Sequence, residues 1–337
     1  MTQAAWQREL SRAITKPDEL IAELGLDAGL LAPARVAAGA FALRVPRGYV
    51  ARMRRGDVND PLLRQVLPAA NEMIEVEGFV PDPLHEAAAV RAPNLLQKYH
   101  GRALLITTQA CAIHCRYCFR REFPYAEQVA DQAADEGTSG RWGAALGAIA
   151  ADSSIEEVIL SGGDPLSLSD ARLASLTDAL DAIAHVRRIR VHTRQPVVLP
   201  SRVDEGLIAW LRGIKLPTVM VIHANHPNEI DAEVRSACQR LRAAGVLVLN
   251  QSVLLAGVND DVDTLKRLST ALVGAGVLPY YLHLPDRVRG TAHFDVEERR
   301  AQELVRELGN RLSGFLVPRL VREVPGAPAK MPSPSIA

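Results

Sequence analysis

The stretch ALLITTQACAIHCRYCFRR at residues 103–121 decides the fold class, because it joins a strand to a loop rich in reactive side chains. Its first residues, Ala103–Thr107, form a short apolar and β-branched run that predicts a buried strand. Three cysteines follow in the pattern C-x3-C-x2-C, at Cys111, Cys115 and Cys118. A strand that runs directly into a polar loop is typical of the βα unit, so the stretch indicates an α/β fold.

The same order of strand, polar loop and amphipathic helix recurs along the rest of the chain. Strands are predicted at Ala103–Thr107, Glu157–Leu160, Arg188–His192, Thr218–His223, Val246–Gln251 and Leu278–His283. Helices are predicted to follow them at Trp142–Ala151, Asp170–Ala184, Val203–Leu211, Glu229–Ala244, Val262–Ala275 and Asp295–Leu308. These six βα units are fewer than the eight that close a TIM barrel. We therefore expect an α/β protein built on a partial (β/α)6 barrel.

The chain divides into three expected segments. Residues 1–95 should form a mainly helical segment, residues 96–310 the barrel, and residues 311–337 a C-terminal segment. The tail from Val324 to Ala337 carries four prolines among small residues. By composition alone, such a tail predicts a disordered end.

A polar or glycine-rich cluster follows each predicted strand. In chain order these clusters are TQACAIHCRYCFRR, SGGDPL, HTRQP, HANHP, NQS and LPD. In a βα barrel the chemistry lies at the carboxyl ends of the strands, where all of these loops meet. We therefore expect the clusters to form one site.

Composition excludes several classes of protein. The chain has 337 residues, is 48% hydrophobic and has a formal net charge of zero, so we expect a large core and no nucleic-acid partner. No apolar run is long enough to span a bilayer, and the N-terminal stretch MTQAAWQRELSRAITKPDEL lacks an apolar signal core. Four cysteines are too few for a disulfide scaffold. We expect a soluble cytoplasmic protein without membrane association.

The three clustered cysteines are candidate metal ligands. Buried thiols or a zinc site are the alternatives, but structural zinc usually takes four protein ligands and no fourth cysteine lies nearby. His114, between two of the cysteines, is a poor substitute. Three thiolates suit a [4Fe–4S] cluster with one iron open to a small molecule. Cys238 falls within a predicted amphipathic helix and is expected in the core.

This cysteine spacing, with the aromatic Tyr117 before the last cysteine, resembles the hallmark of the radical S-adenosylmethionine (SAM) superfamily. Within that superfamily, SGGDPL is similar to the glycine-rich segment that receives the methionine part of SAM. The resemblance implies SAM contacts for Ser161, Gly162, Gly163 and Asp164. Glycines at such a place allow the backbone to approach a ligand closely.

Further segments resemble the lysine 2,3-aminomutase family, which binds pyridoxal 5′-phosphate (PLP) as well as SAM. They cover nearly the whole chain: RVPRGYVARM, DPLLRQVLP, CRYCFRREFPY, LSGGDPL, VHTRQPVVLPSR, HANHPNEI, NQSVLLAGVND and RGTAHF. The stretch QKYHGRALLI and the short C-terminus resemble the branch that makes (R)-β-lysine for modifying elongation factor P.

The resemblance also implies roles for residues outside the cysteine loop. Lys330, after a Pro/Gly-rich turn, matches the PLP lysine, although Met331 follows where the family has threonine. The other lysines lie on a helix, near the N-terminus or before strands. The remaining matches are Lys98 and Arg102 for the PLP phosphate, Arg120 for the substrate carboxylate, Asp286 and Glu323 for its distal ammonium, and His223 and Gln251 near SAM. Catabolic members of the family have aspartate in place of Glu323.

The activity implied by the resemblance is migration of the α-amino group of L-lysine to the β-carbon. A 5′-deoxyadenosyl radical made from SAM starts this reaction in the family. Implied partners are L-lysine, an electron donor of the flavodoxin or ferredoxin type, and the ligase that loads β-lysine onto elongation factor P. A catabolic enzyme or a sister aminomutase for another amino acid remains an alternative. A non-enzymatic iron–sulfur or zinc interaction protein would need neither Lys330 nor the polar clusters.

Overall fold

A computed structural model describes residues 4–124 and 138–333 of the chain. Its centre is one sheet of ten strands, whose order in space is their order along the chain. The strands are β1 Val90–Ala92, β2 Leu95–Tyr99, β3 Arg102–Thr108, β4 Glu157–Gly162, β5 Arg188–Thr193, β6 Thr218–Ile222, β7 Leu247–Val253, β8 Leu278–His283, β9 Arg319–Arg322 and β10 Met331–Pro332. Strands β3 to β9 are parallel, whereas β1, β2 and β10 pair antiparallel at the two edges.

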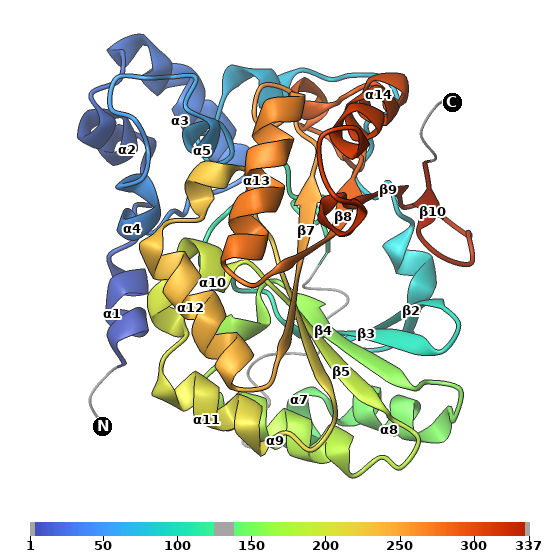
Figure 1. The fold of residues 1–337 in the computed structure, drawn as a ribbon. Coiled ribbons are helices and arrows are strands. Elements are labelled where there is room, and N and C mark those ends of the chain that lie inside the picture. Colours follow the sequence, from blue (N-terminus) through green and yellow to red (C-terminus); the bar gives the residue numbers. More distant parts are fainter. Residues whose placement is uncertain (1–3, 125–137, 334–337) are drawn as a thin grey trace.

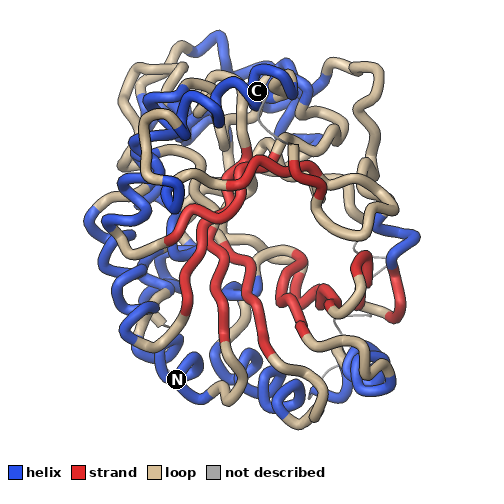
Figure 2. Tube along the Cα trace, turned by 45° about the vertical axis from the view of Figure 1, so that its right-hand side comes forward, coloured by secondary structure: helices blue, strands red, loops and turns tan. Residues whose placement is uncertain are grey.

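The sheet curves round a common interior but does not close. Figure 2 shows the strands as an open arc with most helices on its outer side. The helices are α1 Ala5–Ser11, α2 Pro17–Leu24, α3 Leu31–Ala40, α4 Arg47–Val50, α5 Pro61–Arg64, α7 Thr138–Arg141, α8 Gly143–Ala151, α9 Asp170–Asp181, α10 Gln195–Val198, α11 Glu205–Gly213, α12 Ala232–Ala243, α13 Val262–Gly274 and α14 Glu298–Gly309. This arrangement confirms the expected partial barrel.

Local sequence explains why the outer helices begin where they do. Asp204, Asp231 and Asp261 stand directly before α11, α12 and α13, and each carboxylate accepts a hydrogen bond from a backbone N–H of the first turn. Ser169 caps α9 in the same way. Such caps satisfy N–H groups that have no partner within the helix.

Alternation along the strands separates the core from the interior of the barrel. In β5, Ile189 and Val191 are fully buried in the main hydrophobic core, whereas Arg190 and His192 line the cavity inside the arc. The same period of two places Glu157 and Ser161 of β4 in the cavity. These two strands therefore carry packing residues on one face and cavity-lining polar groups on the other.

The N-terminal segment covers the cysteine loop. Helices α2, α3 and α5 gather at one end of the molecule (Figure 1). The fully buried Arg116 donates hydrogen bonds to Glu72 (Nε–Oε1, 2.8 Å) and to the carbonyl oxygen of Phe41 (2.7 Å). Both acceptors belong to the N-terminal segment, so this segment helps to fix the loop.

The six predicted strands and their six helices are confirmed to within three residues at each end. The sheet has four strands more than the expected barrel, because the short edge strands β1, β2, β9 and β10 carry too weak a pattern to predict. The composition-based expectation of a disordered tail is wrong as far as Ser333. Met331 pairs with Arg322, and Ser333 donates its N–H to the carbonyl oxygen of Leu320.

Two further expectations concern burial and segment boundaries. Cys238 is fully buried in the core, as expected. The division of the chain at residues 95 and 310 stays a prediction, and the edge strands extend the sheet into both flanking segments. None of the helices within residues 4–124 and 138–333 combines the length and the apolar composition that a membrane span needs.

Candidate active site

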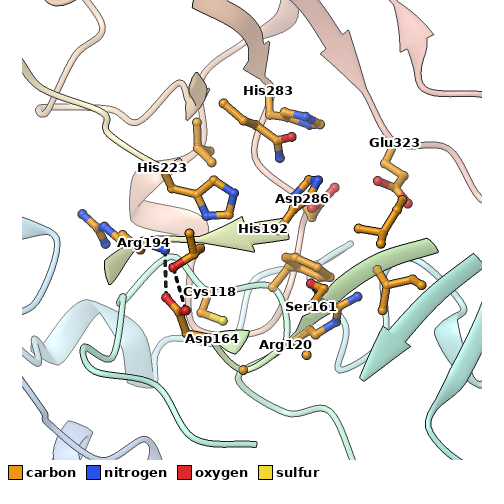
Figure 3. A pocket seen from close by; sticks show the side chains of 18 of the residues that line it. Cys118, Arg120, Ser161, Asp164, His192, Arg194, His223, His283, Asp286 and Glu323 are labelled. Atoms are coloured by element: carbon orange, nitrogen blue, oxygen red, sulfur yellow. Dashed lines mark hydrogen bonds between the residues drawn. The ribbon is translucent and has the colours of Figure 1, made fainter. Parts of the chain in front are cut away.

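A cavity of about 540 Å³ lies inside the arc of strands. Its walls include side chains from β2 to β5, β7 and β8, His223 directly after β6, the cysteine loop and the C-terminal segment. Figure 3 shows side chains from several of these elements turned toward one another. Of the residues implicated by sequence, all line this cavity: Lys98, Arg102, Cys111, Cys115, Cys118, Arg120, Ser161, Gly162, Gly163, Asp164, His223, Gln251, Asp286, Glu323 and Lys330.

The three cysteines lie on one loop that leaves the end of β3. Burial raises the pKa of the Cys118 thiol to about 11 and that of Cys111 well above its ordinary value. A bound metal ion deprotonates a coordinating thiol, so iron could convert these protonated thiols into ligands. No group of three His, Cys, Asp or Glu side chains in the described ranges is arranged to hold a single metal ion. A [4Fe–4S] cluster instead takes its thiolates on separate irons.

The glycines after β4 permit close contact with the cysteine loop. A Cβ atom on Gly163 would lie 2.5 Å from the carbonyl oxygen of Ala110, and one on Gly162 would lie 2.7 Å from that of Thr108. Gly162 also has φ +107°, which side chains disfavour. Only glycine therefore fits where β4 meets the start of the cysteine loop.

The side chain of Asp164 is occupied by hydrogen bonds within the protein. Its Oδ1 accepts from the Thr193 hydroxyl at 2.7 Å, and its Oδ2 accepts from the backbone N–H of Arg194 at 2.8 Å (Figure 3). Further bonds come from the N–H groups of Leu166 and Gln195. The carboxylate thus joins the loops after β4 and β5, so SAM would meet this residue mainly through its backbone.

Among the described residues, one polar atom of His223 and one of Gln251 find no hydrogen-bond partner. His223 Nε2 and Gln251 Oε1 are both buried at the cavity and unpaired. Burial lowers the pKa of His223 to about 4, so the ring is neutral at pH 7. A neutral imidazole and an amide oxygen can each bond a polar ligand. These orphaned atoms fit the expected SAM contacts.

His192 and His283 are cavity residues that the sequence reasoning did not single out. Each has a buried Nε2 atom with no hydrogen-bond partner in residues 4–124 and 138–333, and burial holds the pKa of each ring well below its usual value. Figure 3 places both with His223 around the same space. Both lie at or near the end of a predicted strand, β5 or β8, that a polar cluster follows. This position is the sequence feature that could have identified them.

The acidic and basic groups form a chain of alternating charge. Glu86 accepts two hydrogen bonds from Arg120, each 2.8 Å long, and its Oε1 lies 3.0 Å from Lys98 Nζ. Glu323 accepts from Lys98 at 2.9 Å and from Lys330 at 2.8 Å. Sequence reasoning missed Glu86, which precedes the first strand and lies in no motif that stands out.

Two site residues stand outside this chain of ion pairs. The Arg102 guanidinium lies over the ring of Tyr99, 4.5 Å from its centre, at the cavity wall. Burial, with a contribution from Glu323, raises the pKa of Asp286 to about 7. Met331, the departure from the family pattern, is exposed in β10 and is not part of the cavity wall.

We predict that Gly163→Ala prevents normal iron loading, because the added methyl group would collide with backbone atoms at the start of the cysteine loop. Iron bound per chain after anaerobic reconstitution should fall at least about threefold, since about 0.7 kcal/mol of strain already suffices for that. Gly147→Ala is the matched control, because nothing lies within 4 Å of a Cβ placed on Gly147 in α8. Full iron loading of Gly163→Ala would show that the loop can adjust.

Comparisons with known proteins agree with this geometry. Residues 105–268 match the family model "Radical SAM superfamily". The chain is 47% identical to the L-lysine 2,3-aminomutase of Escherichia coli strain K12, covering 97% of this chain and 94% of that protein. It is 45% identical to the protein of the same name from Haemophilus influenzae, covering 96% and 94%. Identity to the Clostridium subterminale protein is 38%, covering 84% and 67%.

The resemblance read from the motifs is thereby confirmed at the level of the family. The expected [4Fe–4S] cluster and SAM follow from membership, and the cysteine loop and orphaned polar atoms fit them. With identities of 45–47% over nearly the full chain, the protein belongs to the lysine 2,3-aminomutase family of radical SAM isomerases.

Proposed function

We propose that the protein converts L-lysine into (R)-β-lysine and that it needs PLP in addition to the cluster and SAM. The position of Lys330 carries this proposal. Its Nζ lies 2.8 Å from Glu323 Oε2 and lines the same cavity as the three cysteines. A lysine amine and an acid pair thus share a cavity with the loop that would hold the cluster.

The cavity offers two lysines for covalent attachment of PLP, Lys98 and Lys330. Lys330 is the better candidate because it matches the family lysine, and because Lys98 is already paired with both Glu86 and Glu323. When bound, PLP would delocalise the unpaired electron of the substrate, while SAM and the cluster would supply the hydrogen-abstracting radical. Glu323 holds the Lys330 amine in place through an ion pair in which only 14% of the Glu323 side chain is exposed.

Lys98 and Arg102 support a phosphate site at the cavity wall formed by β2 and β3. Lys98 lies one residue before the end of β2, and Arg102 is the first residue of β3. The two cations therefore lie on neighbouring strands. Cationic side chains of this kind bind phosphate oxygens strongly. We assign the PLP phosphate to this pair.

Arg120 suits the substrate carboxylate because Glu86 fixes its plane. Glu86 takes the Nε and Nη2 atoms, and Nη1 lies 3.3 Å from Ser161 Oγ. The planar guanidinium matches the geometry of a carboxylate, which favours arginine for this task. Burial opposes ionisation of Glu86, but Arg120 and Lys98 lower its pKa, so the holding group stays charged.

Asp286 and Glu323 suit the distal ammonium of lysine. The two carboxyl groups influence one another, since Glu323 contributes to the raised pKa of Asp286. Burial opposes ionisation of Glu323, yet the charges of Lys330 and Lys98 hold its pKa well below the ordinary value. An acidic substrate side chain would need a free cation here. The acid pair therefore favours lysine over an acidic amino acid.

The finer biological role is also a proposal. The stretch QKYHGRALLI supports the branch that supplies β-lysine for elongation factor P, through a ligase that loads it. A flavodoxin or ferredoxin would supply the electron to the cluster. Free thiols at the site suit a reducing compartment, so we place the protein in the cytoplasm. A catabolic role or another amino acid substrate is the alternative.

The direct test is anaerobic incubation of the reconstituted protein with L-lysine, SAM, PLP and dithionite, followed by chiral analysis of the products. We expect (R)-β-lysine and none without PLP. Preference for a neutral or acidic amino acid would overturn the substrate, and full turnover without PLP would overturn the cofactor assignment.

We predict that Lys330→Ala removes the covalent attachment of PLP and leaves iron content unchanged. Treatment with borohydride should fix PLP to the wild-type chain but not to the variant, as intact mass measurement would show. Lys266→Ala, on the outer helix α13, should retain the adduct. A trapped adduct in Lys330→Ala would move the attachment to Lys98.

We predict that Asp286→Asn and Glu323→Gln each lower kcat/KM for lysine at least about tenfold, because underpairing a buried ammonium costs about 2–5 kcal/mol. Asp286 must be ionised to hold the ammonium, so wild-type kcat/KM should fall as pH decreases through about 7. Asp286→Asn should lose this step in the pH profile. Asp295→Asn, in an exposed pair with Arg287, is the control. Normal turnover by Asp286→Asn would place the ammonium elsewhere.

A further inference from the structure

Arg194 follows β5 and carries its guanidinium into the protein interior beside the cysteine loop. Its Nη1 donates to the sulfur of Cys115 at 2.7 Å. Its Nη2 donates to Glu229 Oε1 and to Gln65 Oε1, both at 2.7 Å. Only 5% of the side chain is exposed. A buried cation is thus held directly against a sulfur that would bind iron.

The protein fixes this guanidinium from several directions. The backbone N–H of Arg194 is bonded to Asp164, which anchors the start of the side chain. The rings of Tyr117 and Tyr49 lie 5.4 and 5.7 Å from the guanidinium carbon. With these contacts in place, the side chain has little freedom to leave the sulfur.

Glu229 supplies the counter-charge that makes burial possible. Its second oxygen accepts from the backbone N–H groups of Asn225 (2.6 Å) and His226 (2.8 Å), and the carboxylate is fully buried. Although burial opposes it, Arg194 lowers the pKa of Glu229, so the acid stays ionised. Glu229 binds the Nη2 atom of Arg194, while the Nη1 atom donates to the Cys115 sulfur.

We infer that Arg194 tunes the reduction potential of the iron–sulfur cluster through its hydrogen bond to the Cys115 sulfur. The potential of such a cluster depends on its net charge and on hydrogen bonds to its sulfurs. When a flavodoxin or ferredoxin transfers one electron, the cluster gains one negative charge. A fixed N–H donor with a full positive charge stabilises this reduced form more than the oxidised form. Arg194 is therefore a positioning and tuning residue, which contacts a cluster ligand and is not one of the groups assigned to the substrate.

This inference does not depend on the substrate or on PLP, so it can fail while the proposed function stands. The test is a potentiometric titration of the reconstituted holoprotein, without lysine or PLP, with the reduced cluster followed by electron paramagnetic resonance. Arg194→Gln should lower the ratio of reduced to oxidised cluster about tenfold at a given potential, a shift of ~59 mV for one electron.

A second variant should shift the reduction potential of the cluster in the opposite direction. Glu229→Gln keeps Arg194 and its sulfur contact but removes the counter-charge, so the ratio of reduced to oxidised cluster should rise. Arg52→Gln is the matched control: Arg52 also lies over Tyr49 and donates to the Glu229 carbonyl oxygen, and its ion pair is with Asp231. Its cluster should titrate as in the wild type.

Each outcome decides for or against the inference. Arg194→Gln with one cluster per chain and the wild-type potential would overturn it, because a merely structural arginine leaves the potential unchanged. If Arg194→Gln fails to hold a cluster, Glu229→Gln carries the test, and an unchanged or lower potential in that variant would overturn the inference. Arg194→Lys, which keeps the charge, should fall between wild type and Arg194→Gln.

Discussion

The carboxylate of Asp164 is the contact on which the arrangement of the site depends. Its oxygens accept hydrogen bonds from the loop after β5. The backbone N–H of Asp164 donates to the carbonyl oxygen of Ala110 in the cysteine loop at 2.8 Å. The loops that follow β3, β4 and β5 are thus held in fixed positions relative to one another. Burial raises the pKa of Asp164, and the hydrogen bonds oppose this effect. Without that carboxylate, Arg194 would lose the anchor that directs it to Cys115.

Buried ion pairs extend this organisation to the N-terminal segment. Glu72 holds Arg116 and Arg121 from the cysteine loop, and Tyr49 donates to Glu229 at 2.9 Å. Removal of one partner from such a pair leaves an uncompensated buried charge, which is strongly unfavourable. The N-terminal segment therefore does more than cover the barrel. It supplies the acids and hydroxyls that keep the arginines of the site in their places.

The sequence predicted those parts of the structure that rest on local pattern. Short apolar and β-branched runs located the six barrel strands, and the spacing of the cysteines indicated the cluster. Glu86 and Arg194 could not be predicted in the same way, because their importance comes from partners far away in the chain. Glu86 meets an arginine 34 residues later, and Arg194 meets a cysteine 79 residues earlier. The strands β9 and β10 were not predicted, because they are defined by their pairing with neighbouring strands and not by a pattern in their own residues.

Glu323, where the resemblance implies aspartate in catabolic members, has a structural role of its own in the open barrel. Lys98 lies on β2 near the first edge of the sheet, whereas Glu323 and Lys330 flank the turn between β9 and β10 at the last edge. The Lys98–Glu323 ion pair, 225 residues apart in sequence, therefore bridges the gap that backbone hydrogen bonds leave open. Glutamate is longer than aspartate by one methylene, and here each of its oxygens holds a different lysine. The groups proposed to hold the substrate and PLP are thus also those that join the two edges of the sheet.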